Sequence, residues 1–228
     1  MSAKVGTSVT NYLFGYGSLI CSSSAAITGN ITGEAQACIV SGITRSWSAK
    51  VNWEAPTGCQ NTTLSGATAV TCSMVEGLNG SIETCGVLLK VEGDEMTKFD
   101  IREKGYQRIE IQRDQIKSLD SSLPLEIGGG GRIWCYISED RLPSTATNPI
   151  LQSYVDVIIK GCYEHSPKFV ETFVKTTTLW GDGVWIDDRH NPAYTRADNE
   201  WSSEKAKEID EILQRIIPVA FATRTKMK

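Results

Sequence analysis

The sequence predicts an α+β protein in which a strand-rich body precedes a group of helices. Short apolar segments with β-branched and aromatic residues occupy about residues 11–138, separated by glycine, asparagine and serine. From about residue 148 to 217, apolar residues instead recur every three to four positions, which is typical of helices. The 228 residues are 40% hydrophobic and 22% charged, so we expect one domain over 1–228 with a sizeable core.

The first two-thirds of the chain contains the segments expected to form strands. These segments are 12–15, 35–41, 47–53, 67–74, 84–91, 106–112 and 132–137. The intervening segments 52–65 and 118–131 have the composition of loops. A short helix is expected over 92–104, because Met96 and Phe99 form an apolar stripe and Gly105 can end a helix.

The last third of the chain is expected to form three helices. A capping residue followed by proline is a common helix start, and it occurs at Asn148-Pro149 and at Ser166-Pro167. The third helix is expected over 201–217, with Ser202 as its N-cap. The residues expected to face inward are Leu151, Tyr154, Val155, Ile158, Ile159, Phe169, Val170, Phe173, Val174, Ala206, Ile209, Leu213 and Ile216.

Composition argues against several classes of protein. The net charge of -4 is unlike that of a dedicated nucleic-acid binder, and no apolar run approaches the roughly 20 residues that span a bilayer. The polar start of the chain has no signal-peptide core, so we expect a cytoplasmic protein. Seven dispersed cysteines without a Cys-x-x-Cys pair predict reduced, mostly buried thiols. The two histidines lack the spacing of metal ligands, so no metal is expected.

A glycine-rich turn follows the first predicted strand. The chain reads Gly15-Tyr16-Gly17-Ser18-Leu19, and its glycines allow a sharp turn that can approach a ligand closely. Unpaired N–H groups in such a turn form a concavity that attracts a carboxylate or a phosphate. A Gly-x-Gly turn in an ordinary hairpin would have the same sequence, so the turn by itself leaves both interpretations open.

A second segment about ninety residues later gives the turn its significance. It reads Asp100-Ile101-Arg102-Glu103-Lys104-Gly105-Tyr106-Gln107-Arg108. Together the two segments resemble the gamma-glutamylcyclotransferase family, whose members have a Tyr-Gly-Ser-Leu loop near the N-terminus and a later Asp-x-x-Glu…Tyr-x-Arg segment. The resemblance covers about residues 12–113. It implies a small mixed β-barrel with flanking helices, to which this chain would add C-terminal helices.

The resemblance also implies a reaction. It is the intramolecular aminolysis of a gamma-glutamyl amide, which releases 5-oxoproline and needs neither a metal nor an organic cofactor. Glu103 matches the general acid/base of the family. Tyr16, Gly17, Ser18 and Leu19 match the loop that would hold the α-carboxylate of this small-molecule substrate. The alternative for Glu103 is a surface ion pair with a neighbouring Arg102 or Lys104.

Residues that follow Glu103 extend the candidate site. Period-two geometry places Tyr106 and Arg108 on one face of the predicted strand and isoleucines on the other. Tyr106 could line the pocket and Arg108 could orient a carboxylate, although an outward-facing Arg108 is equally compatible with the pattern. Arg45, shortly before Trp47, resembles a basic and aromatic pair at a similar place in the family.

Three further interpretations remain open. Segment 180–192 is rich in Trp, Asp and Gly, and a packed loop in which Asp187 or Asp188 pairs with Arg189 is favoured over a specificity element. The pocket could belong to a non-catalytic module that binds a small metabolite or a carboxylate. The same glutamate could also serve a hydrolase or transferase that acts on another amide.

Overall fold

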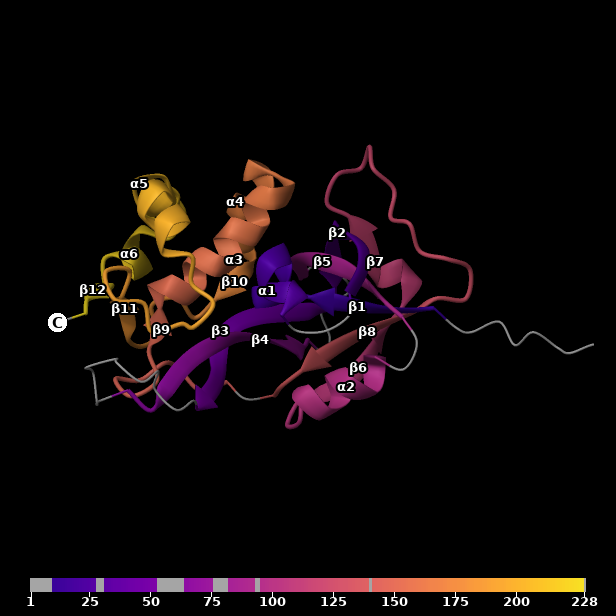
Figure 1. Ribbon diagram of the computed structural model, residues 1–228, viewed down its shortest axis with the longest axis horizontal. Coiled ribbons are helices and arrows are strands. Elements are labelled where there is room, and N and C mark those ends of the chain that lie inside the picture. Colours follow the sequence, from indigo (N-terminus) through magenta and orange to yellow (C-terminus); the bar gives the residue numbers. More distant parts are fainter. Residues whose placement is uncertain are drawn as a thin grey trace, which may run out of the picture.

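The structure is a computed structural model that describes residues 10–27, 31–52, 64–75, 82–92, 95–139 and 141–227. Strands dominate its first part and helices its last part (Figure 1). The strands are β1 (Asn11–Gly15), β2 (Ile31–Ser41), β3 (Ile43–Asn52), β4 (Gly66–Met74), β5 (Glu83–Val91), β6 (Gln107–Ile111), β7 (Ile116–Ser118), β8 (Arg132–Ile137), β9 (Ile150–Leu151), β10 (Thr177–Thr178), β11 (Trp185–Asp187) and β12 (Thr225–Lys226). The helices are α1 (Ser22–Ala26), α2 (Glu95–Arg102), α3 (Gln152–His165), α4 (Pro167–Thr176), α5 (Asn199–Ile216) and α6 (Pro218–Phe221), with short 3-10 turns η1 (Ser18–Ile20) and η2 (Arg113–Gln115).

The described strands form three sheets, and the expected barrel is not confirmed among them. The largest has the order β6-β8-β1-β5-β2-β7, and the two smaller ones are β10-β3-β4 and β12-β11-β9. Among the described residues, no hydrogen-bonded ladder joins these sheets into a closed cylinder. The β3–β4 hairpin instead adds β10, which comes from the far end of the chain and pairs in parallel with β3. The α+β class is thus observed with open sheets.

The six-stranded sheet separates two apolar cores. Its strand β1 lies between β5, which is antiparallel to it, and β8, which is parallel. Leu13 faces the larger core, whereas its neighbours Tyr12 and Phe14 face the smaller one, as the period-two geometry of a strand requires. The larger core also contains the buried faces of the helices that follow, so β1 delivers the glycine-rich turn to the junction of sheet and helices.

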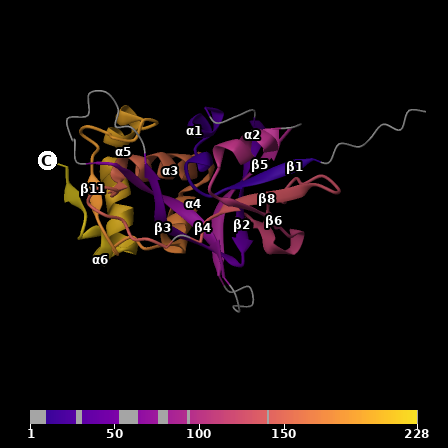
Figure 2. The same cartoon turned by 90° about the horizontal axis from the view of Figure 1, so that it is seen from below.

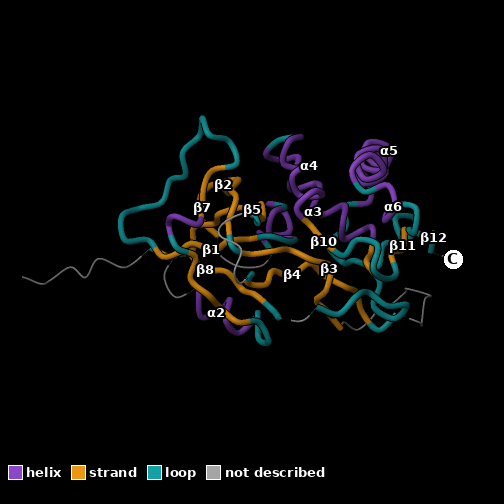
Figure 3. The backbone as a smooth tube through the Cα atoms, turned by 180° about the vertical axis from the view of Figure 1, so that it is seen from behind, coloured by secondary structure: helices purple, strands orange, loops and turns teal. Residues whose placement is uncertain are grey.

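Helices α3 and α4 pack against each other, and α4 also packs on β5. A Cβ atom at Gly161 would lie 2.3 Å from the backbone nitrogen of Cys21, so only glycine allows α3 to approach the segment after η1 this closely. Met96 and Phe99 of α2 belong to the same larger core as the buried residues of α4, and both helices are seen from below in Figure 2. Strands β11 and β12 and helices α5 and α6 gather at one end of the molecule, away from the loop 119–131 (Figure 3).

Two predicted helix starts are wrong. Helix α3 begins at Gln152 rather than at Asn148-Pro149, because Ile150 and Leu151 form β9 and pair with β11. Helix α5 is capped by Asp198, whose side chain accepts a hydrogen bond from the N–H of Trp201, and Ser202 lies inside the helix. The start of α4 is as predicted, since Ser166 caps it at 3.2 Å and Pro167 is its first residue.

The remaining predictions concern one helix, two loops, the cysteines and membrane-spanning segments, and some of the residues involved lie outside the described part of the chain. The expected helix over 92–104 is observed as α2, and the expected loop over 118–131 is irregular beyond the end of β7. Most of the expected loop over 52–65 lies outside the described residues, as do Trp53 and Cys59. The other six cysteines are free and buried. No described helix is both long and apolar enough to cross a membrane.

Candidate active site

The glycine-rich turn lies directly after β1 and leads into η1. Two close contacts explain its glycines: a Cβ atom at Gly15 would lie 2.9 Å from the Cβ atom of Leu19, and one at Gly17 would lie 3.0 Å from Cγ2 of Val70. The carbonyl of Gly17 accepts a hydrogen bond from the N–H of Ile20 at 2.9 Å, which closes the turn. The chain therefore returns sharply, with its backbone close to neighbouring strands.

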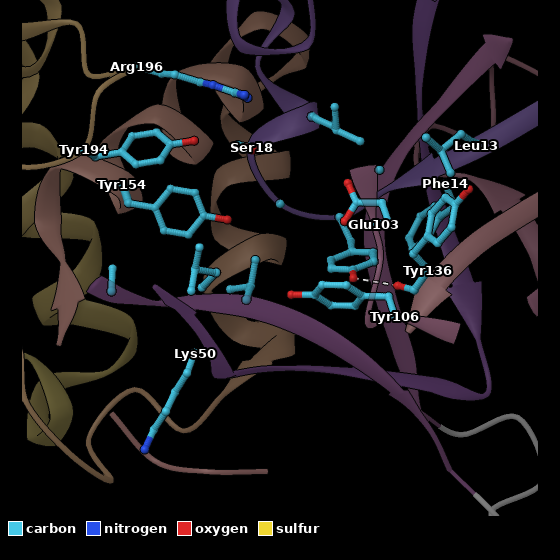
Figure 4. A pocket seen from close by; sticks show the side chains of 18 of the residues that line it. Leu13, Phe14, Ser18, Lys50, Glu103, Tyr106, Tyr136, Tyr154, Tyr194 and Arg196 are labelled. Carbon is cyan, nitrogen blue, oxygen red and sulfur yellow. Dashed lines mark hydrogen bonds between the residues drawn. The ribbon is translucent and has the colours of Figure 1, made fainter. Parts of the chain in front are cut away.

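Glu103 follows the last residue of α2. Its N–H donates to the carbonyl of Phe99 at 2.8 Å, and its own carbonyl accepts from the N–H of Tyr106 at 2.9 Å. Gly105, between them, has a φ of +109°, a conformation that side-chain-bearing residues rarely adopt. This tight turn presents the half-buried side chain of Glu103 beside the ring of Tyr106 (Figure 4).

One cleft brings most of the predicted site residues together. Its volume is about 540 Å³, and the residues from Gly15 to Leu19 form one part of its lining. Glu103 and Tyr106 also line it, together with residues of β3 and β4. Six of the predicted residues, which are Tyr16, Gly17, Ser18, Leu19, Glu103 and Tyr106, thus share one cavity although they come from segments about ninety residues apart.

Arg108 is not among the residues that line this cleft. Its guanidinium donates to the carboxylate of Asp100 at 2.8 Å and lies 4.6 Å from the ring centre of Trp134. The other carboxylate oxygen of Asp100 accepts a hydrogen bond from Tyr136 at 2.7 Å. Arg108 is exposed and β6 is an edge strand, so the outward-facing alternative applies to it.

The sequence did not point to the wall that faces Glu103. That wall contains Tyr154 of α3 and the segment Tyr194, Thr195 and Arg196, whereas Lys50 lies at the edge of the cleft. Figure 4 shows Tyr154, Tyr194 and Arg196 on one side and Glu103 and Tyr106 on the other, with Ser18 between them. Tyr154 fits the apolar stripe of its helix equally well, so periodicity alone could not distinguish a core residue from a cleft residue.

The hydroxyl of Tyr154 lies against the glycine-rich turn. A Cβ atom at Gly17 would lie 3.1 Å from this oxygen. Burial is the main cause that raises the pKa of Tyr154 above its usual range, and the nearby phenol groups of Tyr194 and Tyr106 raise it further. A hydrogen bond with the backbone of Ser18 favours the charged form, but it does not outweigh burial. Tyr154 therefore stays protonated at neutral pH and can donate a hydrogen bond into the cleft.

Comparison with solved structures places this architecture. A structure described as a gamma-glutamyl cyclotransferase has a TM-score of 0.51 and 15% sequence identity, and the match covers 87% of this chain and 99% of that one. The fold is that of this gamma-glutamyl cyclotransferase. A human protein described as uncharacterized has a TM-score of 0.48 at 14% identity, covering 86% of this chain and 97% of that one. A glutathione-specific gamma-glutamyl cyclotransferase from yeast has a TM-score of 0.36 at 14% identity, covering 89% and 98%.

Comparison of the sequence with protein-family models and with curated proteins found no match.

Within this gamma-glutamyl cyclotransferase fold, segment 180–192 packs against α3 and includes the short strand β11. The carboxylate of Asp188 is buried and accepts hydrogen bonds from the N–H and hydroxyl of Ser153, at 2.8 and 2.6 Å, and from the N–H of Ala193 at 2.9 Å. Arg189 pairs mainly with Asp156 of α3, at 2.7 Å, with Asp187 farther away at 4.0 Å. None of the residues 180–192 lines the cleft, but the chain enters the cleft two residues later, at Tyr194.

A row of aromatic rings connects the cleft to the C-terminal elements. Tyr194 lies 4.7 Å from Tyr154, measured between ring centres, and Tyr154 lies 5.7 Å from Trp47. The row continues through Trp180 to Trp185 with successive separations of 5.0 and 5.2 Å. Edge-to-face and tilted arrangements of this kind stabilise ring pairs beyond the burial of their area. We call these five rings the aromatic row.

Arg45 supports the glycine-rich turn from behind. It is fully buried and donates hydrogen bonds to the carbonyls of Cys85, at 2.6 Å, and Tyr16, at 3.3 Å. It also donates to the carbonyl of Phe173 at 3.0 Å near the C-terminus of α4, where the helix dipole favours a positive charge. Arg45 is not among the residues that line the cleft, so its contacts are those of a residue that holds the turn in place.

The described residues include no cluster of three or more His, Cys, Asp or Glu side chains that could hold a metal ion. Among the residues that line the cleft, Glu103 provides the one carboxylate side chain. The polar groups that line the cleft with it are hydroxyl groups, backbone groups and cations. This set of groups suits proton transfer and the binding of an anion.

Proposed function

We propose that this protein is a gamma-glutamylcyclotransferase, which converts a gamma-glutamyl amide to 5-oxoproline by intramolecular aminolysis. One observation carries the proposal: Glu103 and the Tyr16–Leu19 turn, which match two separate family segments, line the same cleft. The shared fold with a gamma-glutamyl cyclotransferase supports it.

The chemistry requires a proton to be moved twice. The α-amino group of the glutamyl unit attacks the side-chain amide carbon, a new C–N bond closes the five-membered ring, and the original amide C–N bond breaks. A free α-amino group has a pKa of about 8, so most of it must lose a proton before it can attack at neutral pH. Glu103 would accept this proton and then donate it to the leaving nitrogen.

Orientation would supply much of the rate, because nucleophile and electrophile belong to one molecule. Well-oriented intramolecular reactions reach effective molarities of roughly 10⁵–10⁸ M. The N–H groups of the glycine-rich turn would hold the α-carboxylate, which fixes the adjacent amino group beside Glu103. The protonated hydroxyl of Tyr154, which lies against Gly17, would donate a further hydrogen bond to bound oxygen atoms.

The first prediction tests the base. Glu103→Gln keeps the size and polarity of the side chain but cannot shuttle a proton, so turnover should fall by about 10²–10⁴-fold. The measurement is the rate of 5-oxoproline formation from a set of gamma-glutamyl amides, monitored by mass spectrometry. Glu110→Gln is the matched control, because Glu110 lies on the nearby strand β6 but pairs with Arg132 outside the cleft. It should leave turnover unchanged.

Other outcomes would contradict the proposal in distinct ways. Binding of gamma-glutamyl compounds without any product would indicate the non-catalytic module. Release of free glutamate instead of 5-oxoproline would indicate a hydrolase. A blocked nucleophile gives the strictest check: an N-acetylated substrate has no free α-amino group, and its turnover would exclude cyclisation.

A further inference from the structure

Arg45 carries a buried charge that no carboxylate of the described residues balances. Its side chain is fully buried, and every group that accepts a hydrogen bond from its guanidinium is neutral. These acceptors belong to Tyr16, Cys85, Phe173, Thr176 and Thr177. A buried charge in a protein is normally paired with an opposite charge, because its removal from water is costly. A guanidinium that is held only by dipoles can therefore still stabilise an anion nearby.

Other arginines of the molecule show the ordinary arrangement. Arg189 pairs with Asp156 at 2.7 Å, and Arg224 pairs with Asp210 at 2.6 Å. The charge of Arg45 instead acts on its neighbours. Burial raises the pKa of the thiol of Cys72, which is paired with Arg45 across β3 and β4, and the charge of Arg45 is the main cause that opposes this rise.

One peptide group connects Arg45 with the cleft. The carbonyl of Tyr16, which accepts from Nη1 of Arg45 at 3.3 Å, belongs to the same peptide group as the N–H of Gly17. The described residues contain no cis peptide bond, so this carbonyl and this N–H point in opposite directions. Gly17 lines the cleft, whereas Arg45 does not. Within the described part of the chain, the N–H of Gly17 has no hydrogen-bond acceptor.

We propose that Arg45 is a positioning residue whose buried charge is balanced by the α-carboxylate of the bound substrate, through the Tyr16–Gly17 peptide group. A hydrogen bond to the carbonyl polarises the peptide and makes its N–H a stronger donor to an anion. This inference rests on the proposed function, and it names what selects the glutamyl end of the substrate. A compound without an α-carboxylate leaves the charge of Arg45 unbalanced and should react poorly.

Thr176 allows this charge to be cancelled while the arginine stays in place. Its Oγ1 atom accepts from Nη2 of Arg45 at 3.0 Å, at the half-buried C-terminal end of α4. Thr176→Asp places a carboxylate beside the guanidinium, and the opposite charge favours the ionised form of that carboxylate. Thr176→Asn is the matched control, because it has nearly the same shape and no charge.

The experiment compares two substrates that differ only in the α-carboxylate, gamma-glutamyl-alanine and 4-aminobutyryl-alanine. In both, the amino group attacks the amide carbon and alanine leaves, which gives 5-oxoproline from the first and 2-pyrrolidinone from the second. The wild-type protein should prefer the first in kcat/KM. Thr176→Asp should reduce this preference by about 10- to 100-fold, the size expected for one hydrogen bond to a charged group, and Thr176→Asn should retain it.

A further variant removes the charge itself. Arg45→Gln should lower the preference at least as much as Thr176→Asp does. It also removes buried hydrogen bonds, so it destabilises the fold, but the ratio of two substrates on one preparation does not depend on how much of a variant is folded. The two Thr176 variants, which keep the arginine, provide the same comparison without that loss.

The results separate the two proposals. Formation of 5-oxoproline with equal preferences in Thr176→Asp and Thr176→Asn, whether retained or lost, would overturn the role of the Arg45 charge alone. If no gamma-glutamyl compound yields 5-oxoproline, the proposed function fails, and the inference fails with it.

Discussion

At the scale of single residues, Gly17 shows how little space separates the backbone of the turn from the side chains around it. The space beside its Cα is bounded by Val70 at 3.0 Å and by the hydroxyl of Tyr154 at 3.1 Å. A methyl group there would displace the tyrosine that faces the turn. The position is thus sensitive for binding, although a shift of two side-chain ends would relieve the contact without unfolding the protein.

Gly17→Ala should therefore lower kcat/KM by about 10²-fold, which is the typical cost of displacing a substrate by roughly 1 Å. The melting temperature should change little. Gly129→Ala is the control, because a Cβ atom at Gly129 meets nothing within 4 Å. A large loss of stability with normal kinetics in the remaining folded protein would make the turn purely structural.

The residues that sequence reasoning identified or missed differ in a consistent way. Glu103 and the turn could be identified from the sequence because each lies in a short segment with a characteristic spacing of residues. Arg108 is not among the lining residues, and alternation assigns a residue to a face of a strand but does not tell which face borders a cavity. Tyr194 and Arg196 follow a loop whose path depends on the buried contacts of Asp188, which local spacing does not encode.

At the scale of elements, the start of α3 depends on a residue from a distant loop. Asp188 accepts hydrogen bonds from the N–H and hydroxyl of Ser153 in the first turn of the helix. Negative charge at this end is favoured by the helix dipole. The hydroxyl of Ser153 also accepts from the N–H of Tyr194 at 3.3 Å, so the same contact positions the cleft wall.

Asp188→Ala should lower the free energy of unfolding by about 1–3 kcal/mol, because it leaves a buried N–H and hydroxyl without their acceptor. Urea denaturation measures the loss. Asp182→Ala removes an exposed carboxylate from the same loop and should stay within about 0.5 kcal/mol of wild type. Equal effects of the two substitutions would show that the buried contacts of Asp188 contribute no more to the free energy of unfolding than the exposed carboxylate of Asp182 does.

The wrong helix starts have a physical cause of the same kind. Asn148-Pro149 has the local chemistry of a helix start, but pairing of the next two residues with β11 delays the helix. Asp198 and Ser202 are both acceptable caps by composition, and the chain uses the one that precedes the first turn. Local signals identified these helices, whereas tertiary pairing determined where they begin.

At the scale of the whole molecule, the predicted α+β class is confirmed, whereas closure of the strands into a barrel is not. Strand composition indicated where most strands lie, because these segments alternate between two cores. It could not indicate that β3 pairs with β10, since those strands are separated by more than 120 residues and β10 has only two residues. The long-range pairings decide whether sheets close, and they have little local sequence signal.

An ion cluster fixes the C-terminal elements to one another. The carboxylate of Asp210 in α5 accepts hydrogen bonds from Arg224, at 2.6 Å, and from Arg189, at 2.8 Å. Burial alone would raise the pKa of Asp210, but these two guanidinium groups outweigh it, and the net shift is downward. A carboxylate with a lowered pKa in the folded state stabilises the fold when it is ionised.

Asp210→Asn should lower the free energy of unfolding by about 1–3 kcal/mol at pH 7. This difference should persist above the unfolded pKa of about 3.9 and shrink as the pH falls through the lower folded value. Urea unfolding from pH 7 down to about pH 3 measures it. Glu211→Gln is the control on the same helix, because Glu211 forms only an exposed pair with Lys207 at 3.9 Å. A difference for Asp210→Asn that does not change with pH would exclude this electrostatic origin.

The aromatic row makes the protein its own optical probe. Trp47, Trp180 and Trp185 have neighbouring ring centres 5.0 and 5.2 Å apart, so their electronic transitions should couple and give a paired signal in circular dichroism. Trp47 also touches Tyr154, whose hydroxyl faces the cleft. A ligand that moves Tyr154 should therefore change the emission of buried indoles several side chains away. Occupancy of the cleft could then be titrated by fluorescence without a label and without turnover.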